Sequence, residues 1–83
     1  MTPTGKIGLD GFVKHFESQF EEIEAGTVQP DHEFRQLPGW SSMQSLIVIA
    51  SFDWEYSVTV SADELRGATT VRDLFEIVQR KIG

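Results

Sequence analysis

The sequence contains no cysteine, few basic residues and no long apolar run. Without cysteine the chain forms no disulfides, and any thiol chemistry requires a thiol supplied by another molecule. Seven basic against thirteen acidic residues give a formal charge of -6, which repels nucleic-acid phosphates and anionic lipids. The first residues, MTPTGKIG, lack the apolar stretch of a signal peptide, and no run approaches the roughly 18 apolar residues of a membrane span. We therefore expect a cytoplasmic protein that binds neither nucleic acid nor membranes.

The length and composition predict one small globular domain. A chain of 83 residues has room for a single hydrophobic core. Hydrophobic residues make up 40% of it and charged residues 24%, which is ordinary for a folded soluble domain. We expect residues 1–83 to form one compact, monomeric unit.

The first third of the chain has the apolar spacing of an amphipathic helix. The residues that recur at steps of three and four are Leu9, Phe12, Val13, Phe16, Phe20 and Ile23. We predict a helix over about residues 10 to 25, with Asp10 as its N-cap and Gly26 as its C-terminal stop. Residues 27–40 have no sustained period and contain two prolines, so they predict a long loop held by Phe34 and Leu37.

Three capping patterns predict the remaining helices. Ser41 with Gln44 matches a capping box, which makes Ser41 the N-cap and Ser42 the first residue of a second helix. Ser61 with Glu64 begins a short third helix that ends near Gly67, and Thr70 with Asp73 begins a fourth that continues to the end of the chain. The predicted fold is an all-α bundle of four helices, with a long first loop and a short third helix.

The stretch WSSMQSLIVIASFDWEYSVTVSADELRGATTVRDLF resembles the acyl carrier protein family, in the subtype whose motif reads Trp-Asp-Ser-Leu. FRQLPGW resembles the approach to that motif, and SADEL and TTVRDLF resemble the family's third helix and the start of its fourth. The resemblance implies a four-helix acyl-carrier-type bundle. It also implies that a separate phosphopantetheinyl transferase attaches 4'-phosphopantetheine to Ser42.

The resemblance further implies the use of that arm. Its thiol would carry acyl groups as thioesters and present them to acyl-loading and acyl-processing enzymes of fatty acid, polyketide or related biosynthesis. The physical setting of Ser42 suits this role, because the first amides of a helix lack internal partners and its dipole favours negative charge there. Ser41, the N-cap beside it, stands where the family has aspartate, so the cap is kept and its charge is lost.

The second helix is the partner-facing side in this family. On a helical projection Gln44, Ile47, Ser51 and Trp54 share one face, and with Met43 and Asp53 they form the predicted partner surface. A core or rim position for Ile47 and Trp54 is the alternative. An apolar cargo groove between the second and third helices is predicted to be lined by Leu46, Ile49, Ala50 and Val60.

Nothing in the sequence indicates an enzyme. It contains no nucleophile-base pair and no phosphate-binding glycine loop. His15 and His32 have no companion at ligand spacing, so we predict no metal site and interpret both as surface residues. Two other functions stay open: an unmodified helical interaction module that binds a protein through Ile47 and Trp54, and a peptidyl or aminoacyl carrier of nonribosomal synthesis.

Overall fold

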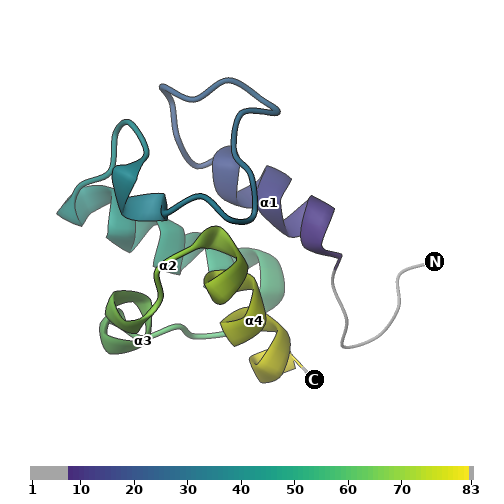
Figure 1. Cartoon of the computed structure of the whole chain (residues 1–83). Coiled ribbons are helices and arrows are strands. Elements are labelled where there is room, and N and C mark those ends of the chain that lie inside the picture. Colours follow the sequence, from purple (N-terminus) through teal and green to yellow (C-terminus); the bar gives the residue numbers. More distant parts are fainter. Residues whose placement is uncertain (1–7, 83) are drawn as a thin grey trace.

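A computed structural model describes residues 8–82 of the chain. Its elements, in chain order, are α1 (Leu9–Glu17), the 3-10 helix η1 (Phe34–Gln36), α2 (Ser42–Tyr56), α3 (Ala62–Gly67) and α4 (Val71–Ile82) (Figure 1). Among these described residues there is no strand, and one isolated antiparallel bridge joins Glu33 to Thr70. The predicted all-helical fold, with its long first loop and short third helix, is confirmed.

Aromatic side chains from three segments meet at the centre of the core. Phe12 of α1 stacks on Phe52 of α2, with ring centroids 5.3 Å apart. Phe16 lies 6.4 Å from Phe34 of η1, edge to face. Each of these four rings is fully buried, and such pairs add about 0.5–1.5 kcal/mol to the burial of their area. Both pairs belong to one hydrophobic core, which therefore holds the three segments together.

Helix α4 completes the core with an apolar stripe. Val71, Leu74 and Val78 are fully buried and Ile77 nearly so, which is the spacing of one helical face. The helix packs against both α1 and α2. Its opposite side carries exposed charged residues, so α4 is a typical amphipathic surface helix.

The first helix is shorter than predicted. Asp10 lies in its first turn, and the capping residue is Gly8. The helix ends at Glu17, where the Ser18 hydroxyl donates to the His15 carbonyl at 2.6 Å. The prediction that this helix runs to about residue 25, from Asp10 to a stop at Gly26, was wrong.

A buried carboxylate explains why the apolar periodicity after Glu17 does not continue as a helix. Glu17 accepts hydrogen bonds from the amides of Gly26 and Val28, both at 2.9 Å, which folds residues 18–28 back against α1. Phe20 is still buried, with its ring 5.1 Å from Phe16. The same apolar residues thus join the core from a loop, where helical geometry is not required.

The loop between α1 and α2 is partly ordered by its own short helix. Phe34, predicted to hold this loop, is fully buried, and Leu37 is half-buried against the core. Both predicted loop contacts are therefore confirmed. The backbone at His32 and Pro30 also accepts amide bonds from the start of α4, at Val71 and Arg72. These bonds attach the loop to the far end of the chain.

Two of the three predicted capping boxes form in full. Ser61 and Glu64 exchange bonds of 3.1 and 2.9 Å at α3, and Thr70 and Asp73 exchange bonds of 3.2 and 3.0 Å at α4. At α2 only half of the box is present, as described below. Each complete box satisfies amides that the first turn leaves without partners.

Candidate functional site

The start of α2 presents Ser42 to solvent. Ser41 is the N-cap, in extended conformation, and its hydroxyl accepts the amide of Gln44 at 3.1 Å. Ser42 is the first residue of the helix, and its side chain is exposed. Within residues 8–82 no hydrogen bond engages its hydroxyl, whereas its carbonyl accepts from Ser45 at 2.7 Å. The predicted division of roles, with Ser41 as cap and Ser42 at the first position, is therefore observed.

Gln44 does not reach back to complete the box. Its side-chain amide donates instead to the carbonyl of Gln19, at 2.9 Å. This contact joins the first turn of α2 to the segment after α1. The predicted capping box was therefore wrong in its second half, because a tertiary acceptor lies within reach of the glutamine.

Trp40 fixes the approach to the site. Its ring stacks on Phe20 at 6.2 Å and meets Phe34 edge to face at 5.1 Å. Gly39, immediately before it, has a φ of 88°, a conformation that costs other residues energy. Trp40 is half-buried by these contacts, so it is a packing residue that orients the chain entering α2.

A cavity of about 390 Å³ lies between α2 and α3. Ser41 and Ser42 line it, together with the apolar side chains of Leu46, Ile49 and Leu65. Of the four residues predicted for a cargo groove, Leu46 and Ile49 line this cavity. The other two do not. Ala50 lies in a different hollow, next to α1, and Val60 is 1% exposed, within the core.

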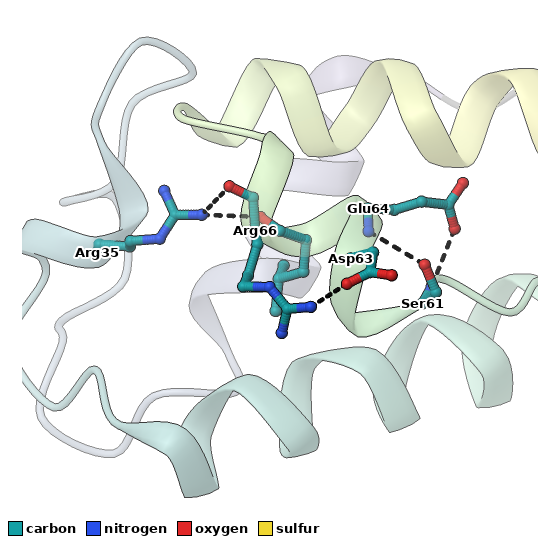
Figure 2. Close-up of polar contacts among 6 residues, drawn as sticks. Arg35, Ser61, Asp63, Glu64 and Arg66 are labelled. Carbon is teal, nitrogen blue, oxygen red and sulfur yellow. Dashed lines mark hydrogen bonds and ion pairs between the residues drawn. The ribbon is translucent and has the colours of Figure 1, made fainter.

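Two arginines line the same cavity, and we did not predict either of them. Arg35, from η1, donates to the carbonyls of Leu65 and Arg66 at 2.9 and 2.8 Å (Figure 2) and to that of Ala68 at 2.8 Å. Arg66 forms an ion pair with Asp63 inside α3. Arg35 and its acceptors are 30 to 33 residues apart, so sequence spacing gives no signal for this contact.

The predicted partner surface is exposed in part. Trp54 is 84% exposed, Met43 67% and Ile47 40%, so neither Trp54 nor Ile47 is a core residue. Ile47, Ser51 and Trp54 line one shallow hollow of about 570 Å³ between α1 and α2. Asp53 is exposed but does not line that hollow, and Gln44 is half-buried by its bond to Gln19.

His15 lies at the edge of that hollow and is not the surface residue that we predicted. It is half-buried, its ring meets Tyr56 edge to face at 5.3 Å, and its Nε2 atom is buried with no hydrogen-bond partner among the described residues. Burial, with a smaller contribution from Glu55, raises the pKa of Tyr56 to about 12.

His32 is also half-buried, and its Nδ1 accepts the amide of Gln29 at 3.1 Å.

A third cavity, of about 500 Å³, lies between α1 and the loop that follows it. Val13, Phe20 and Val28 are among the apolar residues that line it, and no predicted site residue lies there. Within residues 8–82 no group of three histidine, aspartate or glutamate side chains is arranged as metal ligands are. None of the described helices combines the length and apolarity needed to cross a membrane.

The site is thus an exposed serine hydroxyl at the start of α2, beside a cavity with apolar walls and two arginines. A comparison with known proteins adds no family to this description. No protein-family model, curated protein or solved structure matches the chain.

Proposed function

We propose that this chain is an acyl carrier protein that bears 4'-phosphopantetheine on the hydroxyl of Ser42. The observation that carries the proposal is the position of that hydroxyl: exposed, at the first residue of α2, and on the wall of the α2–α3 cavity. When bound, the arm would supply a thiol, which the chain itself lacks. Acyl groups held on it as thioesters would then be presented to partner enzymes.

The residues around Ser42 fit the proposed group. A phosphodiester at the first turn of a helix lies where the unpaired amides and the helix dipole favour negative charge. No aspartate or glutamate of the described residues lines the adjoining cavity, whereas Arg35 and Arg66 do. The volume of about 390 Å³ also falls within the range of roughly 300–1,000 Å³ typical of small-ligand sites.

The loss of the motif's acidic residue leaves the local structure intact. Ser41 caps α2 as an aspartate would, through its bond to the amide of Gln44. A carboxylate there would add roughly 0.3–1 kcal/mol of favourable interaction with the helix dipole. With serine, less negative charge faces the attached phosphodiester. We propose that the transferase which modifies this chain accepts an uncharged cap.

The proposed partners are a phosphopantetheinyl transferase and acyl-loading and acyl-processing enzymes in the cytoplasm, with the carrier acting as a monomer. Fatty acid and polyketide pathways use such carriers, and a peptidyl or aminoacyl carrier of nonribosomal synthesis would use the same serine. The exposed Met43, Ile47 and Trp54 of α2 supply the docking surface. Docking and tethering together raise the effective concentration of cargo at the enzyme.

Intact mass measurement tests the modification. The chain is incubated with coenzyme A and a broad-specificity phosphopantetheinyl transferase, alongside Ser42→Ala and Ser41→Ala variants. We expect a phosphopantetheine-sized mass gain in the wild type and in Ser41→Ala, and none in Ser42→Ala. Ser45→Ala, one turn further along α2, is the matched control. If the folded wild type gains no mass with several transferases, the proposal is wrong.

An unmodified interaction module is the second candidate. It is favoured by the exposure of Trp54 and Ile47 on a helix that also contributes Val48 and Phe52 to the core, because large exposed apolar side chains are typical of contact surfaces. In that case a protein partner would bind the wild type and Ser42→Ala equally well, and Trp54→Ala would weaken binding by about 2 kcal/mol. Isothermal titration with the candidate partner separates the two functions.

A further inference from the structure

Helix α3 is a short wall of the α2–α3 cavity. It has six residues, and Leu65 is its buried side chain. Ala62 and Leu65 face the cavity from α3, while Leu46 and Ile49 face it from α2. A helix this short is not stable alone. Contacts with the rest of the molecule therefore decide where this wall lies.

Arg35 supplies the contact at the C-terminal end of α3. One terminal nitrogen donates to the carbonyls of Leu65 and Arg66 at 2.9 and 2.8 Å (Figure 2), and the other donates to that of Ala68 at 2.8 Å. The last carbonyls of a helix lack internal partners, and a cation at that end is favoured by the helix dipole. Hydrogen bonds from a charged donor are among the stronger ones in proteins.

Arg35 also contacts the hydrophobic core through Phe34. The guanidinium of Arg35 lies 4.7 Å from the centroid of the Phe34 ring, and Phe34 is fully buried in the hydrophobic core. Arg35 therefore connects the end of α3 to the buried core. A second contact, from Lys81 to Glu64 at 3.1 Å, holds α3 on its other side.

We propose that Arg35 is a positioning residue that sets the width of the α2–α3 cavity and thereby determines which apolar acyl groups it shelters. The inference rests on the proposed carrier function for the identity of the cargo. The position of the α3 wall depends on Arg35 whether or not Ser42 is modified. The side chains that α2 and α3 place across the cavity from each other include the apolar Leu46, Ile49 and Leu65, so the selected groups are hydrocarbon acyl chains, distinguished by length and bulk.

Arg66 offers a matched control. Its guanidinium lines the same cavity, but it pairs with Asp63 one turn away in the same helix. Both side chains of that pair are largely exposed, and exposed ion pairs contribute little to stability. Replacing Arg66 therefore removes an equal charge from the cavity without releasing α3 from the core.

Hydrogen exchange tests the positioning role on the unmodified chain. In Arg35→Gln we expect the amides of Leu65 to Ala68 to exchange about tenfold faster than in the wild type, which is the effect of losing about 1.4 kcal/mol of local stability. The amides of α4 serve as the internal reference, and Arg66→Gln should match the wild type. Arg35→Lys should be intermediate, because one ammonium does not reproduce the guanidinium fork. Unchanged exchange at α3 in Arg35→Gln would overturn the inference.

Cargo selection is tested on protein to which the transferase has attached acyl-phosphopantetheine from acetyl, hexanoyl or decanoyl coenzyme A, with release of adenosine 3',5'-bisphosphate. Cleavage by hydroxylamine reports how far each thioester is sheltered. We expect the wild type and Arg66→Gln to protect one chain length over the others, and Arg35→Gln to lose that preference. Equal preference in all three proteins would refute selection by Arg35. A wild type that accepts no arm would instead refute the carrier function and the selection with it, while exchange at α3 still decides the positioning role.

Discussion

Glu17 is a charged residue that the fold places inside the protein. It is 5% exposed, and its two oxygens accept the amides of Gly26 and Val28. A buried carboxylate is tolerated when its hydrogen bonds replace those it made with water. The contact closes the loop after α1 and brings Phe20 back to Phe16. One side chain therefore determines the course of about ten residues.

Replacing this carboxylate should destabilise the whole domain. Glu17→Gln keeps the shape of the side chain but replaces one of the two accepting oxygens with an amide NH2 group, a donor that would face a backbone N–H. We expect the free energy of unfolding to fall by about 2 kcal/mol, the cost of losing one charge-assisted bond in a buried site. Urea denaturation measures it, with the exposed Glu21→Gln as the control. Equal stability of the two variants would show that the loop closes without this contact.

Tyr56 gives a second test at the residue scale, because it is the only tyrosine in the chain. Burial, and to a lesser degree Glu55, raises its pKa from 10.0 to about 12. The unfolded chain therefore loses this proton at a lower pH than the folded one. The stability linked to the group is fully present below pH 10 and is lost as the pH rises toward 12.

Ultraviolet absorbance measured against pH follows the ionisation of this single phenol directly. We expect ionisation near pH 12 in the folded protein and near pH 10 in concentrated urea. Tyr56→Phe keeps the ring packed on Phe12 and Phe52 and removes the proton, so its stability should decline less between these pH values. A folded-state transition at the ordinary tyrosine pKa would contradict a pKa raised by the partial burial of Tyr56.

At the scale of elements, α2 differs from the other long helices because both of its sides carry apolar residues. Val48 and Phe52 are fully buried, whereas Met43, Leu46 and Trp54 are mostly exposed. In α4 the apolar residues gather on one side, which is what burial against a single core requires. The exposed side of α2 is therefore not explained by the stability of this fold, and contact with a partner is its proposed purpose.

Helix α4 depends on its capping box. Asp73 accepts the amides of Thr70 and Thr69 at 3.0 and 2.9 Å, and these bonds hold the pKa of its carboxyl below the usual value. A carboxyl with a lowered pKa in the folded state stabilises the fold above its unfolded pKa of about 3.9. That contribution is lost as the pH falls through the folded pKa, because the unfolded chain then binds more protons.

Asp73→Asn isolates this pH dependence. At neutral pH we expect the variant to be less stable than the wild type, because a neutral amide oxygen is a weaker acceptor for the amides of Thr69 and Thr70 than the carboxylate is. Between about pH 5 and pH 2.5 it should lose less stability on acidification than the wild type does. Urea midpoints at the two pH values measure both effects, with the exposed Asp53→Asn as the control. Parallel acid profiles for Asp73→Asn and the wild type would rule out this linkage.

At the scale of the whole molecule, the negative charge of the chain is not concentrated on α2, the helix that carries the exposed apolar side chains. The chain carries a formal charge of -6, but α2 holds just two acids, Asp53 and Glu55, both near its C-terminal end. Its exposed large side chains are apolar along most of its length. Docking through α2 should therefore depend on desolvation of apolar surface more than on attraction between opposite charges.

A salt titration tests this division. We expect the Kd for the proposed phosphopantetheinyl transferase to change by less than about threefold between roughly 50 and 300 mM NaCl, because salt screens charges and leaves apolar contacts. Trp54→Ala should weaken binding strongly and Asp53→Asn weakly. A steep loss of affinity with salt would show that charge directs the docking.

The sequence by itself predicted the elements whose signals are local. The four helices, the cap at Ser41 and the boxes at Ser61 and Thr70 follow from residues three or four apart, and the structure has each of them. The position of Ser42 as the first residue of α2, beside its cap, also followed from a local pattern. Capping bonds and apolar periodicity involve residues three or four positions apart, so they are predicted from the sequence without knowledge of the fold.

Contacts between distant residues were decided by the tertiary structure alone. The early end of α1 depends on Glu17 meeting amides nine and eleven residues away. The second half of the capping box at α2 does not form because the side chain of Gln44 donates to the carbonyl of Gln19 instead. The C-terminal end of α3 is bound by Arg35, which lies 30 residues before Leu65 in the chain. A local sequence pattern indicates which hydrogen bonds a side chain is able to form with its neighbours in the chain. Only packing brings a competing partner within hydrogen-bond distance and so determines which bond forms.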